Sequence, residues 1–151
     1  MKIAIGVDHG GWSLKQAVID ELKKLGHTVI DCGAPTYDAT DDYPDFARAV
    51  GASIQRGETE RGIVICGSGV GVAIAATKMR GIRACLCHDT YSAHQGVEHD
   101  NMNVLALGAR IIGDELAREV VRAFVSAKFD GSERFQRRLN KVIDLEKHNK
   151  L

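Results

Sequence analysis

A cysteine followed by three alternate glycines is the part of this sequence best suited to chemistry. The segment reads CGSGVG over residues 66–71, after an apolar run rich in β-branched residues and before a helical stretch over 72–79. Because glycine has no Cβ, backbone N–H groups in such a turn can converge on an anion or a developing oxyanion. The following helix N-terminus adds partial positive charge, which favours the thiolate of Cys66. We interpret the segment as a base or nucleophile beside an oxyanion cradle, with a buried strand-end cysteine as the alternative.

Polar residues also accompany the other apolar runs. They are Asp8-His9, Asp42-Tyr43, His88-Asp89 and Gly108-Ala109-Arg110. Taken singly, Asp8 could cap a helix and His9 could be a turn residue. Ligands of open α/β sheets bind at the carboxyl ends of the strands, and these residues all fall there. Together they predict a polar crevice of the size of a sugar.

Three arginines stand near the end of the chain, at the start of an expected helix. Arg134 and Arg138 are four residues apart and therefore share a helical face. The planar guanidinium fork suits a phosphate dianion. From these residues alone, a solvated basic face explains the pattern better than a phosphate site.

The elements that must position these residues alternate along the chain. Strands are expected at 3–7, 27–30, 63–65, 82–87 and 103–107, and helices at 13–25, 44–56, 72–79, 90–98, 114–127 and 132–147. Strands separated by helices imply right-handed βαβ crossovers and a parallel sheet covered on both faces. The sequence therefore predicts one Rossmann-like, doubly wound α/β domain over residues 1–151, with a five-stranded parallel sheet.

The overall composition excludes several classes of partner. Lys+Arg and Asp+Glu each number 20, and no block of like charges occurs, which argues against nucleic-acid and membrane-surface binding. No apolar run approaches the roughly 20 residues of a membrane span, and we expect no signal peptide at the N-terminus.

The four cysteines show no zinc-binding spacing. They are Cys32, Cys66, Cys85 and Cys87. Cys85 and Cys87, followed by His88, could form a soft-metal fragment, but we expect the two thiols on one side of a buried strand. Free thiols without a signal peptide indicate the cytoplasm.

The sequence resembles the type B ribose-5-phosphate isomerases and the related galactose-6-phosphate isomerase subunits over nearly its whole length. The matching segments are Asp8-His9-Gly10-Gly11, Asp42-Tyr43-Pro44, residues 66–71, His99, residues 103–110 and the pair Arg134 and Arg138. Each is weak alone, whereas their order and spacing together are highly specific.

This resemblance implies an aldose–ketose isomerase of phosphorylated sugars that uses neither a metal nor an organic cofactor, and a place in the pentose phosphate pathway. It also implies a homodimer, paired into a tetramer in some relatives. Each active site would be completed by the neighbouring subunit, and the helix over 132–147 would reach that partner.

The resemblance also implies roles for individual residues. Cys66 would be the base that moves a proton between C1 and C2 through an enediolate, since the loop at 72–75 lacks the glutamate that some relatives use instead. His99 would open the furanose ring. The remaining positions are Ser68 in the family's Ser/Thr place, Gly67, Gly69 and Gly71 around the enediolate oxygen, Asp8 and Tyr43 on the sugar, and His9, Arg110, Arg134 and Arg138 on the phosphate.

Three departures bear on the substrate. Relatives commonly carry His-Asn, whereas here Asp100 follows the histidine and Asn101 comes next, so both are candidate substrate-binding residues. An aspartate cannot donate as an amide does, and its charge opposes an enediolate. Phe135 replaces a common histidine, and the segment before Arg134 is one residue longer than in many relatives.

Other function classes fit less well. Asp31 stands where a dinucleotide-binding acid is expected, but the first turn is not GxGxxG, and Val72 stands where a cysteine phosphatase needs arginine. A non-catalytic sugar-phosphate sensor would need neither Cys66 nor His99. We therefore expect interconversion of ribose 5-phosphate and ribulose 5-phosphate; the alternative substrates are allose 6-phosphate, galactose 6-phosphate or a tetrulose phosphate.

Overall fold

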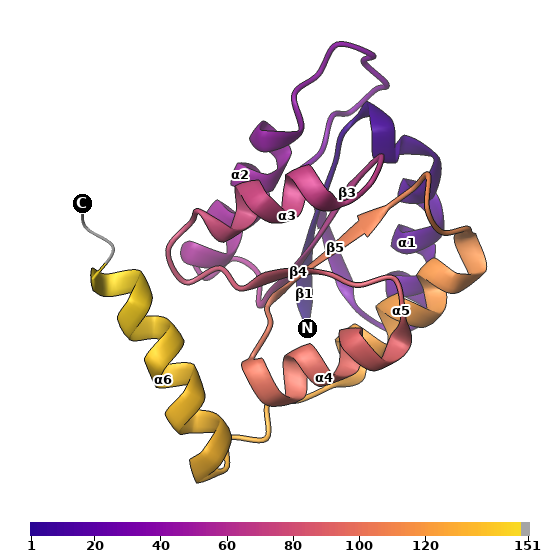
Figure 1. Ribbon diagram of the computed structural model, residues 1–151. Helices are drawn as coiled ribbons and strands as arrows, with labels where there is room; N and C mark the ends of the chain where they lie inside the picture. Colours follow the sequence, from indigo (N-terminus) through magenta and orange to yellow (C-terminus); the bar gives the residue numbers. More distant parts are fainter. Residues whose placement is uncertain (149–151) are drawn as a thin grey trace.

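Five parallel strands form one sheet in the order β2-β1-β3-β5-β4 (Figure 1). The computed structural model describes residues 1–148, so the last three residues of the expected domain lie outside the described part. The strands are Lys2–Val7 (β1), Thr28–Asp31 (β2), Arg61–Cys66 (β3), Ala84–Leu86 (β4) and Val104–Gly108 (β5). The predicted doubly wound α/β sheet is confirmed, with β1, β3 and β5 in its centre.

Helices cover both faces of this sheet, as expected. They are the short 3-10 turn His9–Gly11 (η1), Trp12–Lys24 (α1), Tyr43–Gln55 (α2), Val70–Thr77 (α3), Thr90–Asp100 (α4), Asp114–Ser126 (α5) and Glu133–His148 (α6). In Figure 1, α1, α4 and α5 lie on one face and α2 and α3 on the other. No helix within residues 1–148 is long and apolar enough to cross a bilayer.

The two faces of the sheet differ in side-chain size. Strand side chains alternate between faces, so Ile5, Ile65 and Leu107 pack under α1, α4 and α5, while Ala4 and Cys66 pack under α2 and α3. The smaller side chains allow α2 to lie close to the sheet. Cys66 is therefore directed towards the face where α2 and α3 begin.

Strand β4 corrects one expectation about the cysteines. The predicted strand at 82–87 is shorter, ends at Leu86 and lies at the edge of the sheet, so Cys85 is exposed and only Cys87 is buried. A central strand would have buried both, but an edge strand is covered on one side only. The side-chain interaction between the two thiols lowers the pKa of Cys85 to about 6 and raises that of Cys87.

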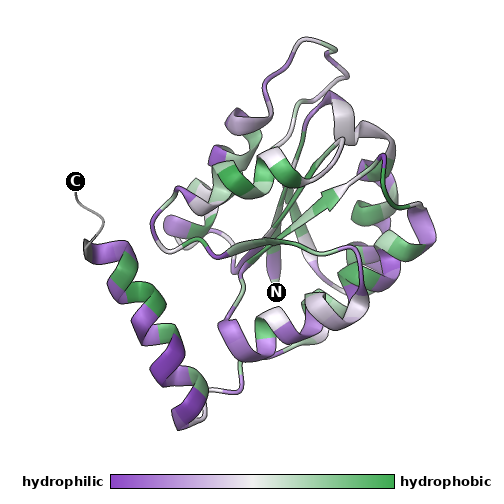
Figure 2. Ribbon diagram, viewed as in Figure 1, coloured by the Kyte–Doolittle hydropathy of each residue, from purple (hydrophilic) through white to green (hydrophobic). Residues whose placement is uncertain are grey.

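Helix α6 stands apart from the sheet (Figure 1). Within its described part Leu139 is its buried apolar residue, while Val142 and Leu145 are 51% and 67% exposed. Figure 2 shows apolar residues interspersed with strongly polar ones along this helix. Its first turn touches the last turn of α4, where Phe135 stacks on His99. Helix α6 thus buries little apolar surface within its own chain.

Candidate active site

The ends of the three central strands are tied together at the carboxyl edge of the sheet. Asp8 N–H donates to the Ile65 carbonyl (3.3 Å), and Ala109 N–H donates to the Cys66 carbonyl (2.9 Å). Arg110 N–H donates to the Gly67 carbonyl (2.9 Å). The segments that follow β1, β3 and β5 are therefore neighbours, as the sequence predicted.

Cys66 ends β3 with its sulfur beside the glycine turn. The residue is 6% exposed, and its Sγ accepts a hydrogen bond from the N–H of Gly69 at 3.1 Å. Gly69 has a φ of +80°, a left-handed conformation that glycine adopts without a Cβ penalty, and its N–H points at the sulfur. An N–H donor stabilises negative charge on sulfur, so the turn is suited to a cysteine that acts as a base.

The glycine turn does not offer all its N–H groups to a ligand. Val70 N–H donates to Ser68 Oγ (3.3 Å), and Gly69 N–H is used by the sulfur. The donors that a helix leaves without an intrahelical acceptor are those of its first turn, here from Val70 to Val72. The N–H donors of an oxyanion cradle at this place would therefore come from the first turn of α3 rather than from Gly69.

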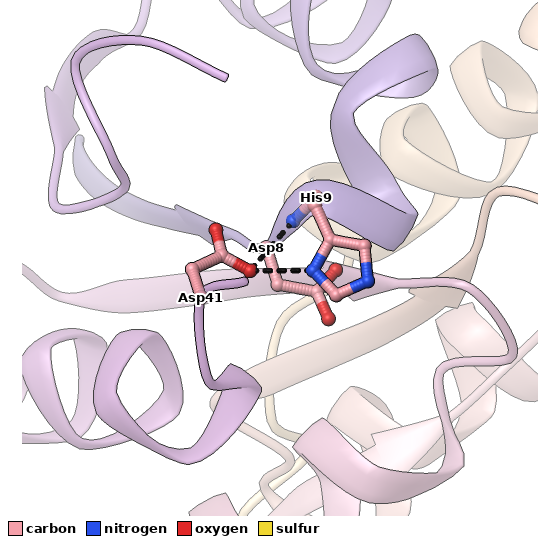
Figure 3. Close-up of side chains that lie close together, drawn as sticks. All are labelled: Asp8, His9 and Asp41. Carbon is pink, nitrogen blue, oxygen red and sulfur yellow. Dashed lines mark hydrogen bonds and ion pairs between the residues drawn. The ribbon is translucent and has the colours of Figure 1, made fainter. Parts of the chain in front are cut away.

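Asp8, His9 and Asp41 form a cluster beside this turn (Figure 3). Asp8 is 5% exposed, its Oδ1 accepts from the Gly11 N–H (2.9 Å), and burial raises its pKa. One oxygen of Asp41 accepts both from the backbone N–H of His9 (3.0 Å) and from its Nδ1 (2.7 Å). The hydrogen bond that His9 donates to Asp41 raises the pKa of His9.

Within residues 1–148, this cluster is the one group of three or more His, Cys, Asp and Glu side chains whose ligand atoms all lie within 4.8 Å of one another. Two hydrogen bonds from His9 to Asp41 account for the short distance between these two side chains. The Nδ1 atom of His9 and the Oδ1 atom of Asp41 are therefore bonded to each other rather than arranged around a cation.

Arg110 and Tyr43 flank the glycine turn on its two sides. A Cβ built on Gly67 would lie 3.3 Å from Nε of Arg110, and one built on Gly71 would lie 2.9 Å from the ring of Tyr43. Both glycines thus allow the side chain of a predicted site residue to lie against the backbone. The structure brings together the predicted residues of this edge: Asp8, His9, Tyr43, Cys66, Gly67, Ser68, Gly69, Gly71 and Arg110.

The other predicted residues form a second group near the amino edge of the sheet. Helix α4 begins at the carboxyl edge and runs back for 11 residues, about 16 Å, so that His99 lies in its last turn. Asn103, which follows, accepts a hydrogen bond at its carbonyl from Gly62, near the start of β3. Within one chain, His99 and Cys66 therefore lie towards opposite edges of the sheet.

His99 is held by a helix neighbour and by α6. Nε2 of Gln95 lies 2.8 Å from Nδ1 of His99, and the ring of Phe135 stacks on the imidazole with 4.2 Å between centroids and 14° between planes. The guanidinium carbon of Arg134 lies 5.8 Å from the centre of the Phe135 ring. Phe135 thus places an apolar ring on His99.

The remaining members of this second group surround the end of α4. Asn101 ends the helix in a left-handed conformation with a φ of 53°, next to the exposed Asp100. Arg138 lies one helical turn beyond Arg134 on α6 and is exposed. His99, Asp100, Asn101, Arg134 and Arg138 therefore share one region, which is separate from the carboxyl edge.

Two residues whose side chains hydrogen-bond to predicted site residues were missed in the sequence. Gln95 precedes His99 by four residues on a helix, so the i,i+4 rule could have found it. Asp41 is one of several acids in an irregular loop, and no local pattern distinguishes it. Conversely, His88 and Asp89 serve the fold: His88 Nε2 accepts from Gly108 N–H (3.0 Å), and Asp89 caps α4.

Comparisons with known proteins agree on one family. The Ribose/Galactose Isomerase family model matches residues 3–142. The chain is 43% identical to ribose-5-phosphate isomerase B of Escherichia coli, covering 96% of both chains. It is 45% identical to D-erythrulose-4-phosphate isomerase of Pectobacterium atrosepticum, covering 87% of this chain and 86% of the relative. The solved ribose-5-phosphate isomerase B of Clostridium thermocellum superposes with a TM-score of 0.93 at 46% identity, covering 97% of this chain and 98% of that one.

Proposed function

This chain belongs to the ribose/galactose isomerase family, and from that premise we propose that it interconverts ribose 5-phosphate and ribulose 5-phosphate. Relatives that match it over nearly their whole length are aldose–ketose isomerases of sugar phosphates. The observation that carries the proposal is the sulfur of Cys66, held by an amide donor at the end of the central strand. The glycine turn that follows it lies against Arg110 and Tyr43.

The proposed reaction moves one proton between neighbouring carbons. After His99 has transferred the proton that opens the furanose ring, the Cys66 thiolate removes the proton from C2 of the aldose. The C–H electrons form the C1–C2 double bond of an enediolate, while S–H forms. A proton then passes from the C2 hydroxyl to O1 of the enediolate. The S–H returns its proton to C1 as the C2 carbonyl forms, which gives the ketose and regenerates the thiolate. A positioned base of this kind is worth about 10²–10⁴ in rate.

The first turn of α3 supports the enediolate in this proposal. The partial positive charge at its N-terminus, together with the N–H groups of Gly71 and Val72, which have no intrahelical acceptor, would stabilise the oxyanion that forms beside Cys66. The reaction changes no net oxidation state, because C1 is reduced from an aldehyde to an alcohol while C2 is oxidised from an alcohol to a ketone. A base and hydrogen-bond donors therefore supply all that the reaction requires. We accordingly assign it neither a metal nor an organic cofactor.

We also propose that the working molecule is a homodimer with shared active sites. A five-carbon sugar phosphate cannot reach from Cys66 at one edge of the sheet to His99 and Arg134 near the other. A second copy could bring its His99, Asp100, Asn101, Arg134 and Arg138 to the carboxyl edge of the first. The exposed apolar residues Val142 and Leu145 on α6 would then be covered by the partner. Two such dimers could pair into a tetramer.

The domain organisation and the location follow the same reasoning. Residues 1–148 share one sheet with two packed faces, which supports a single isomerase domain whose α6 reaches the partner subunit. The four cysteines are free thiols, which supports a cytoplasmic location. The balanced charge supports a small phosphorylated substrate rather than a nucleic acid or a membrane.

A different sugar phosphate is the second candidate. The relative from Pectobacterium atrosepticum is named for D-erythrulose 4-phosphate. In this chain the ring of Phe135 lies on His99, and Asp100 stands beside it. An apolar ring and an added carboxylate beside the ring-opening histidine could favour a shorter sugar that has no furanose ring to open.

The test is a kcat/KM panel of four- to six-carbon aldose and ketose phosphates, with deuterium incorporation from solvent at C2. We expect ribose 5-phosphate to be the best substrate and its C2 proton to exchange. Higher kcat/KM for a tetrulose phosphate would select the second candidate, and complete retention of the C2 proton in every product would contradict base catalysis.

Cys66→Ala provides the matching variant. We expect kcat to fall by about 10²–10⁴-fold with the fold intact. Cys32→Ala is the control, because this partly buried thiol, whose pKa burial raises, lies after the outer strand β2 and outside the proposed site. Wild-type turnover in Cys66→Ala would refute the role given to the sulfur.

A further inference from the structure

We propose that Asp41 is a positioning residue that fixes the imidazole of His9 for binding the substrate phosphate. The inference rests on the proposed function, because it assumes that His9 contacts the phosphate of a sugar phosphate. It adds a residue outside the segments on which the family resemblance was based. Asp41 itself does not touch the substrate in this arrangement; it acts through His9.

The geometry of the pair is that of a support. A single oxygen, Oδ1 of Asp41, accepts from the backbone N–H of His9 at 3.0 Å and from its Nδ1 at 2.7 Å (Figure 3). Two bonds to the main chain and the ring of the same residue restrict its side-chain torsions. The Asp41 side chain is 9% exposed and that of His9 is 34% exposed, so the support lies beneath the group that it orients.

These bonds decide which ring nitrogen is left for a ligand. A carboxylate only accepts, so Nδ1 of His9 must carry a hydrogen. The other nitrogen, Nε2, points away from Asp41 in Figure 3 and remains for the substrate. In its protonated form His9 then presents an N–H to a phosphate oxygen, in a charge-assisted hydrogen bond.

The charges around His9 favour the protonated form. The carboxylates of Asp41, Asp8 and Asp38 act in this direction, and the guanidinium of Arg110 acts against it. The balance raises the pKa of His9, with the Asp41 hydrogen bond as the largest cause. A cationic His9 beside Arg110 would give the phosphate dianion two positive partners on this chain.

The loop before α2 holds Asp41 in place. Oδ1 of Asp38 accepts from both the N–H (2.9 Å) and the hydroxyl (2.7 Å) of Thr40, and Asp41 N–H donates to the Asp38 carbonyl (3.3 Å). Asp38 thus shapes the turn without bonding to His9. An asparagine at position 38 could still accept both bonds from Thr40, which makes Asp38→Asn a matched control for Asp41→Asn.

The experiment compares wild type, Asp41→Asn and Asp38→Asn by ¹⁵N-edited NMR of the histidine rings and by steady-state kinetics over pH 5.5–8.5. In the wild type we expect neutral His9 as the Nδ1–H tautomer. In Asp41→Asn we expect the pKa of His9 to fall. At pH values above the pKa, a fall of one unit reduces the fraction of cationic His9 about tenfold. In that pH range KM for ribose 5-phosphate should rise by about the factor by which the cationic fraction falls, whereas at low pH it should equal that of the wild type; kcat should be nearly unchanged.

Several results would overturn the role of Asp41. The first is a neutral wild-type His9 that is the Nε2–H tautomer. The second is a His9 pKa that is the same in Asp41→Asn and in the wild type. The third is a change of KM in Asp38→Asn as large as that in Asp41→Asn. A purely structural role would lower the melting temperature and kcat without a pH-dependent KM. The wild-type tautomer is decisive even if Asp41→Asn does not fold.

A failure of the proposed function would look different. A wild type that turns over no sugar phosphate would remove the isomerase assignment. The NMR titration, repeated with inorganic phosphate as the ligand, would still decide whether Asp41 governs His9: weaker phosphate binding in Asp41→Asn than in Asp38→Asn is expected, and equal binding would contradict the inference.

Discussion

Asp8 is a single residue whose buried carboxyl group lowers the stability of the folded state when it is ionised. Its carboxyl is 5% exposed, accepts a hydrogen bond from Gly11 and has its pKa raised, mainly by burial. A folded-state pKa above the unfolded value means that the folded state binds the proton more tightly. The resulting stabilisation is complete below the unfolded pKa and is lost as pH rises through the folded pKa. At neutral pH the ionised Asp8 therefore disfavours the folded state.

Asp8→Asn should accordingly stabilise the protein while reducing its activity. Asparagine keeps an acceptor for Gly11 N–H but carries no charge, so we expect the free energy of unfolding in urea at pH 7.5 to rise. The gain should shrink as pH falls towards 4. Asp38→Asn should act oppositely, because the Thr40 hydrogen bonds lower the pKa of Asp38. A loss of stability in Asp8→Asn at pH 7.5 would contradict this account.

At the scale of elements, the junction between β3 and α3 is the part on which the site depends most. Gly69 adopts a φ of +80°, and a Cβ there would lie 2.4 Å from Cδ1 of Leu86 and 2.8 Å from the carbonyl carbon of Leu107. The junction is therefore enclosed by β4 and β5 as well as conformationally restricted. It both begins α3 and directs an N–H at the Cys66 sulfur.

Gly69→Ala should damage stability and turnover together. We expect the free energy of unfolding in urea to fall by about 3 kcal/mol, because the cost of a left-handed conformation adds to the cost of the steric overlap of the new methyl group. Gly57→Ala is the control: its φ is +71° but no atom lies within 4 Å of the added methyl, so only the conformational cost of about 1 kcal/mol applies. Equal effects of the two substitutions on kcat would show that the junction does not set the position of Cys66.

At the scale of the whole molecule, the division of the site is the dominant feature. Asp8, His9, Tyr43, Cys66 and Arg110 belong to the carboxyl edge of the sheet, whereas His99, Arg134 and Arg138 belong to the other end of α4 and to α6. Helix α6 covers little of its own chain, and its apolar residues Val142 and Leu145 are exposed. Both facts support an assembly in which two copies complete each other.

Subunit mixing tests this arrangement. Cys66→Ala and the double variant Arg134→Ala/Arg138→Ala should each be nearly inactive alone. If each site combines Cys66 of one copy with the arginines of the other, a mixed dimer contains one intact site, and random reassortment restores about a quarter of wild-type turnover. The control is the same mixture before subunit exchange. Activity that stays at the level of the separate variants would place both groups on one chain and contradict the shared site.

The sequence by itself determined the elements and the residues that end them. Alternating apolar runs predicted five parallel strands, because the periodicity of burial is a local property of the chain. Since strand carboxyl ends meet at one edge, the positions of Asp8, Cys66 and Arg110 followed from the strand assignments. The glycine turn was found in the same way, because its conformation requires a missing Cβ.

Only the tertiary structure decided which of these groups meet. Nothing local pairs Asp41 with His9, 32 residues away, because the contact depends on how an irregular loop returns over β1. The order of strands places β4 at the edge, and pairing order is not encoded in any single strand; this is why Cys85 is exposed. The length and direction of α4 carry His99 away from Cys66. The residues that the sequence predicts as one site therefore form two groups in space.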